Sequence, residues 1–250
     1  MMTEDDFYLR WCEVTADQKP FDMARLAGAL ATSPGQIFVA GYQAAIRATF
    51  PELNQNGWFC FAVTEDRSIA PNPDIDPVLP GVTLKHGEVT GFKTWIAAAN
   101  NVDVLVLKVG SGDAAVYGYV AAEDTGVAIN LRSSGFLADM SQGAAEFSHA
   151  AFTPLTESSG VRDFRRTEPF YIYLALLARL SAPGADAGKE IGKCAAAVLI
   201  EQRGDPDLVR LDQTVSELLT MMDRDGVMLG DHWDLDKRLF TMYSKGIQGA

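Results

Sequence analysis

The sequence has few cysteines, few histidines and no long apolar run. Its three cysteines, Cys12, Cys60 and Cys194, are odd in number and far apart, which argues against a disulfide framework or a thiolate metal site. The three histidines have no second ligand at helical spacing, so we expect no bound metal. No segment approaches the roughly 20 apolar residues of a membrane span, and positions 4 to 6 are acidic where a signal peptide would be basic. We therefore predict a cytoplasmic protein that neither crosses nor binds a membrane.

Positive charge is also scarce. The chain has 21 lysines and arginines against 33 aspartates and glutamates, a formal net charge of -12. Such a chain has no basic face large enough to neutralise a nucleic-acid backbone, so nucleic acid is not an expected partner. An anionic small ligand stays open, because a few local donors or one helix N-terminus suffice to bind it.

The N-terminal part, residues 1–56, has helical periodicity. A first helical stretch extends from about Asp6 to Ala31 and is weakened near Lys19-Pro20, because proline disfavours the helical conformation in the residue before it. A second helix is predicted over 33–50, with Ser33 as N-cap and proline at the first helical position. We therefore predict a short N-terminal helical segment.

Between residues 57 and 156 the pattern changes to short runs rich in aromatic and β-branched residues. The run WFCFAVTE at 58–65 is followed by a proline-rich excursion and then by several strand-like runs separated by glycines. Dense turn signals with little helical periodicity predict a central antiparallel β-domain, either a barrel or a sandwich.

Helical periodicity returns in the C-terminal part, residues 157–250. Four helices are predicted, over 169–180, 188–203, 206–224 and 232–246, and Asp205 before Pro206 is a candidate N-cap. Their short connections predict an antiparallel helix bundle. The predicted fold class is α+β and multi-domain: N-terminal helices, central β-domain and C-terminal bundle.

Two local segments carry a family resemblance. Val63-Thr64-Glu65 closes the first predicted strand, and Gly91, Lys93, Trp95 and Ile96 stand in the segment GFKTWIA. Both resemble segments of the acyl-CoA dehydrogenases, and the order of helices, β-domain and helix bundle is also similar to that family. The resemblance covers residues 36–156 best.

The resemblance implies a cofactor, FAD, and a substrate, an acyl-CoA or related thioester. The family's threonine after the first strand meets the flavin, and its tryptophan backs the flavin ring, which implies those roles for Thr64 and Trp95. Val63, Ile96 and Ala97 complete the implied cofactor-binding set, with Ala97 in the place of a family threonine that donates to the flavin. For Trp95 the alternative is a core aromatic of the β-domain, buried for its apolar area.

The resemblance also implies a catalytic glutamate in the C-terminal helices, and Glu168 is the candidate. That glutamate removes the proton α to the thioester carbonyl while the flavin accepts a hydride. The alternative for Glu168 is an acidic residue in the first turn of a helix, near the positive helix end.

Two functions follow from these observations. The first is an FAD-dependent acyl-CoA dehydrogenase-like enzyme, a homodimer or tetramer, that carries out α,β-dehydrogenation. The second is a non-catalytic binding or assembly protein derived from such enzymes, which has lost the anchors for FAD and the base. It is favoured by Ala97, by Asp66-Arg67-Ser68 in place of the family's proline-containing loop after Glu65, and by the short C-terminal bundle.

Overall fold

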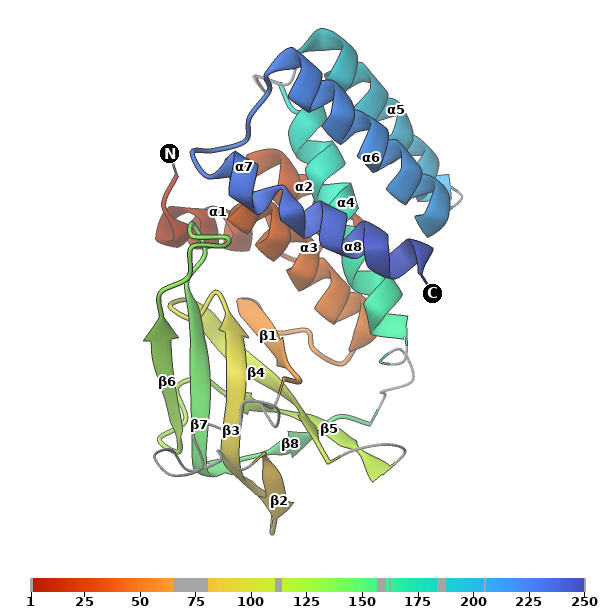
Figure 1. Ribbon diagram of the computed structural model, residues 1–250. Coiled ribbons are helices and arrows are strands. Elements are labelled where there is room, and N and C mark those ends of the chain that lie inside the picture. The colour runs from red at the N-terminus through yellow and green to blue at the C-terminus, as the bar shows by residue number, and fades with distance from the viewer. Residues whose placement is uncertain are drawn as a thin grey trace. The chain divides into compact units, whose positions relative to one another are not determined.

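The computed structural model describes residues 2–64, 81–110, 114–156, 161, 163–183, 188–204 and 206–249. The chain forms two compact units (Figure 1). The helical unit consists of Met1–Asn56, Gly135–Met140 and Ser159–Ala250, and the β-unit of Gly57–Ser134 and Ser141–Ser158. Helices from both ends of the chain therefore share one unit.

The helical unit contains eight helices within the described residues. They are α1 (Glu4–Thr15), α2 (Pro20–Leu30), α3 (Pro34–Thr49), α4 (Phe164–Ser181), α5 (Lys189–Gly204), α6 (Leu208–Asp225), α7 (Trp233–Asp236) and α8 (Arg238–Gln248). The predicted weakening near Lys19-Pro20 is the break between α1 and α2. None of the helices described is both long and apolar enough to cross a membrane.

Helix α3 follows its sequence signals closely. The Ser33 side chain accepts a hydrogen bond from the Gln36 N–H at 3.4 Å, and Pro34 opens the helix with its fixed φ. Every residue from Pro34 to Ile46 is buried, so α3 lies inside the unit rather than on its surface. The predicted cap and helix are confirmed.

Helix α4 is the centre of the packing. It contacts α2 and α3 as well as α5, α6 and α8, so it joins the N-terminal helices to the C-terminal ones. Two glycines permit this close approach: a Cβ added at Gly28 would lie 2.4 Å from the Ala175 carbonyl oxygen, and one at Gly41 would lie 2.4 Å from the Ile172 Cα. The backbones are therefore too close for any side chain at these two positions.

Three helix boundaries differ from the prediction. Helix α4 begins at Phe164, so Pro169 is inside the helix instead of at its start. Helix α6 begins at Leu208, and its N-cap is Asp207, whose carboxylate accepts the Val209 and Arg210 N–H groups; Asp205 lies outside the described residues. The predicted helix 232–246 is two helices, α7 and α8. Proline and aspartate clusters signal a helix start, but they do not fix which of several neighbouring positions caps it.

The β-unit has two four-stranded sheets. The first has the order β1 (Trp58–Ala62), β4 (Val102–Val109), β5 (Val116–Ala121), β8 (Thr153–Pro154), and the second the order β2 (Thr83–Lys85), β3 (Glu88–Ala97), β7 (Gln142–Ala151), β6 (Val127–Arg132). Among the described strands no pairing joins one sheet to the other, so they form two separate sheets and not a closed barrel.

One strand pair departs from the antiparallel prediction. Strand β1 pairs with β4 in parallel, because the chain forms β2 and β3 of the other sheet before it returns to the first. Parallel strands need such a long crossover, and turn signals along the sequence do not reveal it. The all-buried pattern of β1, from Trp58 to Ala62, fits a strand covered on both faces.

Candidate functional site

The segment with the strongest family resemblance forms an irregular part of β3. The pairing of β3 with β7 shifts register twice, first between Val89 and Gly91 and again between Lys93 and Ile96. At the second shift Thr94 and Trp95 form a bulge. A bulge leaves its extra residue outside the regular ladder and changes the direction of the side chains beside it. This irregularity sets where the Trp95 side chain lies.

The bulge lies beside the end of β1. The Thr94 N–H donates to the Thr64 carbonyl oxygen at 3.0 Å, and the Thr94 hydroxyl lies 3.3 Å from the same oxygen. Trp95 is half-buried, whereas Val63 and Thr64 are exposed. The structure therefore brings together three of the predicted cofactor residues, and they form an exposed edge of the β-unit, which we call the Thr64–Trp95 edge.

The other two predicted cofactor residues are buried. Ile96 is 0% exposed and Ala97 is 2% exposed. The Ala97 N–H donates to the Cys60 sulfur at 3.4 Å, which is inside the β-unit. A cofactor on the Thr64–Trp95 edge would not touch their side chains as they lie here. Glu65 and the loop that follows it to residue 80 lie outside the described residues.

Lys93, which also matches the family segment, is a buried residue. It is 1% exposed, and its ammonium donates to the Lys108 carbonyl oxygen at 2.8 Å. Because Lys93 is on β3 and Lys108 is on β4, this hydrogen bond joins the two sheets. Lys93 therefore has a structural part in the β-unit.

Two residues next to the edge carry no signal in the sequence. Gln142 on β7 accepts the Trp95 indole N–H at 3.1 Å, and Arg132 on β6 donates to the Thr94 carbonyl oxygen at 3.0 Å. Neither belongs to a motif. They could be found only from the register of β6, β7 and β3, which the sequence does not provide.

Glu168 belongs to the helical unit, where it lies in the second turn of α4. The first turn, residues 164 to 167, contains no acidic residue, so the alternative of a first-turn acid is wrong. Burial raises the pKa of Glu168 from 4.5 to about 7, and the hydrogen bond with Tyr243 opposes that rise. The carboxyl therefore exchanges its proton near neutral pH, as a general acid or base must.

A polar network surrounds this carboxyl. The ring of Tyr243 on α8 meets the ring of Tyr173 on α4 edge to face, with centroids 6.5 Å apart. The Tyr173 hydroxyl donates to Asp212 at 2.7 Å, and the second oxygen of Asp212 accepts from Ser244 and Gln248 at 3.0 Å each. Burial, followed by the neighbouring Asp212, raises the pKa of Tyr173, and burial, followed by the Glu168 charge, raises the pKa of Tyr243. Both phenols therefore stay protonated at neutral pH.

The raised pKa of Glu168 predicts a pH-dependent stability. Between pH 4.5 and about 7 the folded chain holds a proton on Glu168 that the unfolded chain releases. The stability that this bound proton gives the fold is therefore greatest at the acidic end, and it is lost as the pH rises through about 7. Glu168→Gln should therefore unfold with a free energy about 2 kcal/mol higher than that of the wild type at pH 8, with the difference shrinking toward pH 5.

Urea unfolding at pH 5, 6, 7 and 8 measures this difference. Glu217→Gln is the matched control, because Glu217 is an exposed glutamate of α6. Parallel pH profiles for wild type and Glu168→Gln would show that the Glu168 pKa is ordinary.

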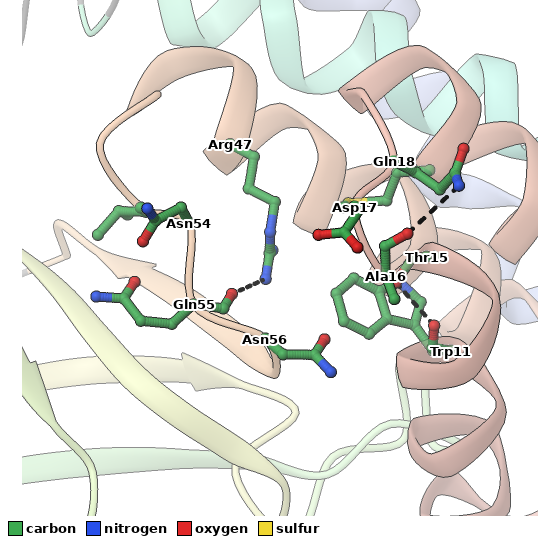
Figure 2. A pocket seen from close by; sticks show the side chains of 11 residues that line it. Trp11, Thr15, Ala16, Asp17, Gln18, Arg47, Asn54, Gln55 and Asn56 are labelled. Carbon is green, nitrogen blue, oxygen red and sulfur yellow. Dashed lines mark hydrogen bonds between the residues drawn. The ribbon is translucent and has the colours of Figure 1, made fainter.

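A pocket of about 380 Å³ lies elsewhere in the helical unit, between the α1–α2 turn and the residues that follow α3 (Figure 2). Arg47 forms one wall. Its guanidinium lies 5.0 Å from the centre of the Trp11 ring, and it donates to the Gln55 carbonyl oxygen at 3.2 Å and to the Gln43 side chain at 3.1 Å. These contacts hold the chain after α3 against α1, and none of the predicted site residues lines the pocket.

No protein-family model and no curated protein matches the chain. Solved structures do match. The structure described as PigA with FAD and proline has 12% identity over 98% of this chain and 83% of its own, with a TM-score of 0.58. The prolyl acyl carrier protein oxidase AnaB has 9% identity over 87% of this chain and 78% of its own, with a TM-score of 0.55.

The butyryl-CoA dehydrogenase of Megasphaera elsdenii matches with 10% identity over 99% of this chain and 89% of its own, and a TM-score of 0.55. Together these matches show that the chain has the acyl-CoA dehydrogenase-like fold. The resemblance indicated by the two sequence segments is confirmed at the level of the fold. At such low identity the likeness assigns neither a cofactor nor an activity to this chain.

Proposed function

We propose that the chain is an FAD-binding, acyl-CoA dehydrogenase-like oxidoreductase that acts on an acyl thioester. The observation that carries this proposal is the Thr64–Trp95 edge, an exposed edge with a half-buried indole on a fold shared with a structure solved with FAD. A homodimer or tetramer and a cytoplasmic location stay predictions.

The residues of the edge suit the ring system of a flavin. An indole offers an apolar face for stacking, and the exposed Thr64 offers a hydroxyl for the polar rim of the ring. FAD, when bound, supplies the acceptor of the hydride that leaves the β-carbon of the acyl group. In this proposal Trp95 backs the ring and Thr64 orients it.

Glu168 is the group that we propose for the proton. A glutamate of ordinary pKa is a weak base at neutral pH, whereas a pKa of about 7 matches the pH at which the α-proton of a thioester must be taken up. Tyr243 holds the carboxyl by its hydrogen bond. Glu168 accepts one proton, and the electron pair of that C–H bond forms the α,β double bond as the hydride departs.

The names of the solved relatives suggest two substrate types. Butyryl-CoA dehydrogenase is named for a CoA thioester and AnaB for a prolyl group on an acyl carrier protein. Both are acyl thioesters, and this shared group is the substrate class that we propose.

A second function is favoured by one observation. Ala97 has no hydroxyl to offer a flavin, and its N–H is directed to Cys60 inside the β-unit. A chain without that donor could serve as a non-catalytic binding or assembly protein. This alternative predicts a colourless protein that takes up no flavin.

An absorption spectrum with and without added FAD separates the two functions. We expect flavin bands that stay with the protein on gel filtration, and bleaching of these bands by butyryl-CoA or by a prolyl thioester. Glu168→Gln should keep the flavin but reduce it about 10² to 10⁴ times more slowly. Glu217→Gln on the exposed face of α6 should behave like the wild type. A protein that never takes up FAD would exclude the enzyme, and undiminished reduction in Glu168→Gln would remove Glu168 from the base role.

A further inference from the structure

Hydrogen bonds from three different strands or strand ends converge on the bulge at Thr94–Trp95. Thr64, just after β1, accepts the Thr94 N–H; Arg132 on β6 donates to the Thr94 carbonyl; and Gln142 on β7 accepts the Trp95 indole N–H. The N–H and the carbonyl of Thr94, and also the ring of Trp95, are therefore held by residues outside β3. A bulge normally loses ladder hydrogen bonds, and here neighbouring residues replace them.

Gln142 is placed by the sheet to reach the ring. On β7 it is the register partner of Ala97 on one side and of Arg132 on the other. The indole has a single polar group, its N–H donor. A hydrogen bond from this nitrogen to Gln142 therefore fixes the side-chain torsion that rotates the ring. The face of Trp95 then has one orientation.

Arg132 acts on the backbone beside the ring. It is exposed at the end of β6, and its guanidinium reaches across β7 to the Thr94 carbonyl at 3.0 Å. A charge-assisted bond to a carbonyl of the bulge restrains the peptide that carries Trp95. Loss of this bond would allow the bulge to move and the ring with it.

We infer that Gln142, with Arg132 behind it, is a positioning residue that orients Trp95 as a fixed wall for a planar heteroaromatic ring. This inference rests on the proposed function, in which that ring is the isoalloxazine of FAD. The wall is preorganised, since the ring of Trp95 is held before any ligand arrives. Preorganisation lowers the cost of ordering a side chain on binding.

Two substitutions at Gln142 test the inference. Gln142→Leu removes the acceptor at similar size, and Gln142→Glu keeps an acceptor oxygen. For Gln142→Leu we expect a shifted indole N–H resonance of Trp95 in the flavin-free protein, assigned with Trp95→Phe, and a Kd for FAD raised about five- to tenfold. Bound FAD should also recover part of its fluorescence, because a tilted indole stacks less on the ring. Gln142→Glu should restore the Kd to within about twofold of the wild type.

Arg132→Met gives a second, independent variant, because it keeps the stem but removes the donor. We expect it to raise the Kd for FAD by about tenfold and to broaden the same indole resonance. Gln213→Leu on α6 is the matched control, because Gln213 is an exposed glutamine of the helical unit, and it should change neither measurement.

The outcomes separate this inference from the proposed function. If wild type binds FAD and Gln142→Leu binds it equally well with equal quenching, Gln142 is structural only and the inference is overturned. An indole resonance that does not move in Gln142→Leu overturns it as well. If wild type binds no FAD, the proposed function fails, and the flavin-free NMR measurement still shows whether Gln142 holds the ring.

Discussion

Asp212→Ala is expected to destabilise the helical unit by about 3 kcal/mol or more. Asp212 is 1% exposed, and its two oxygens accept hydrogen bonds from Tyr173, Ser244 and Gln248. Alanine would remove all three charge-assisted bonds, and the buried Tyr173, the half-buried Ser244 and the exposed Gln248 would each lose this acceptor. Because Ser244 and Gln248 are on α8, this C-terminal helix should be the first element to loosen.

Urea unfolding gives the loss of stability, and hydrogen exchange across residues 238–248 locates it. Glu217→Ala is the matched control, because Glu217 is an exposed carboxylate on the same helix, and its unfolding free energy should stay within about 0.5 kcal/mol of the wild type. The unfolding free energy of Asp212→Asn should lie between those of Asp212→Ala and Glu217→Ala. The asparagine oxygen can still accept the hydrogen bond of Tyr173, but its NH2 group would face the Gln248 amide, which is also a donor. An Asp212→Ala protein as stable as the control would contradict the network.

Gly41→Ala is expected to cost about 2 to 4 kcal/mol, although alanine favours helix over glycine by about 1 kcal/mol elsewhere. The added methyl group would lie 2.4 Å from the Ile172 Cα, and a backbone atom cannot rotate away as a side chain can. The whole of α3 would have to move from α4. Gly28→Ala meets the Ala175 carbonyl oxygen at the same distance and should behave alike.

Gly246→Ala provides the contrast. Gly246 is in helix α8, and a Cβ there would meet nothing within 4 Å, so the helix preference alone should act and stabilise the chain by about 0.5 to 1 kcal/mol. Thermal unfolding of the three alanine variants side by side measures both signs. If Gly41→Ala melts at or above the wild-type temperature, α3 and α4 are not in direct backbone contact.

Local sequence signals predicted the elements well where the cause of an element is local. Ser33 and Pro34 mark the start of α3, and Pro20 marks the break before α2, because caps and prolines act within one turn. The parallel pairing of β1 with β4 depends on residues more than forty positions apart, such as Trp58 and Val102. No local pattern encodes such a pairing, and for this reason the sheet order could not be read from the sequence.

The residues of the candidate site also divide into those that a local sequence signal indicates and those that it does not. Thr64 and Trp95 could be found because they belong to segments that resemble a family. The same segment also predicts Ala97 as a cofactor residue, yet Ala97 is buried beside Cys60. Which side chains of a strand point into the core depends on the pairing register, and the segment alone does not give that register. Gln142 and Arg132 could not be found, because their relation to Trp95 arises only when three strands pair with a bulge between them.

The backbone contact between α3 and α4 also constrains the order in which the chain can fold. The two helices are separated by the entire β-unit, more than a hundred residues of sequence. If that stretch were still unfolded, closing the loop would cost about 4 kcal/mol of chain entropy. During synthesis α2 and α3 must wait, with their apolar surfaces uncovered, until α4 leaves the ribosome. A β-unit that has already folded shortens the effective loop, so its early folding would speed completion of the helical unit and shorten the exposure of those surfaces to aggregation.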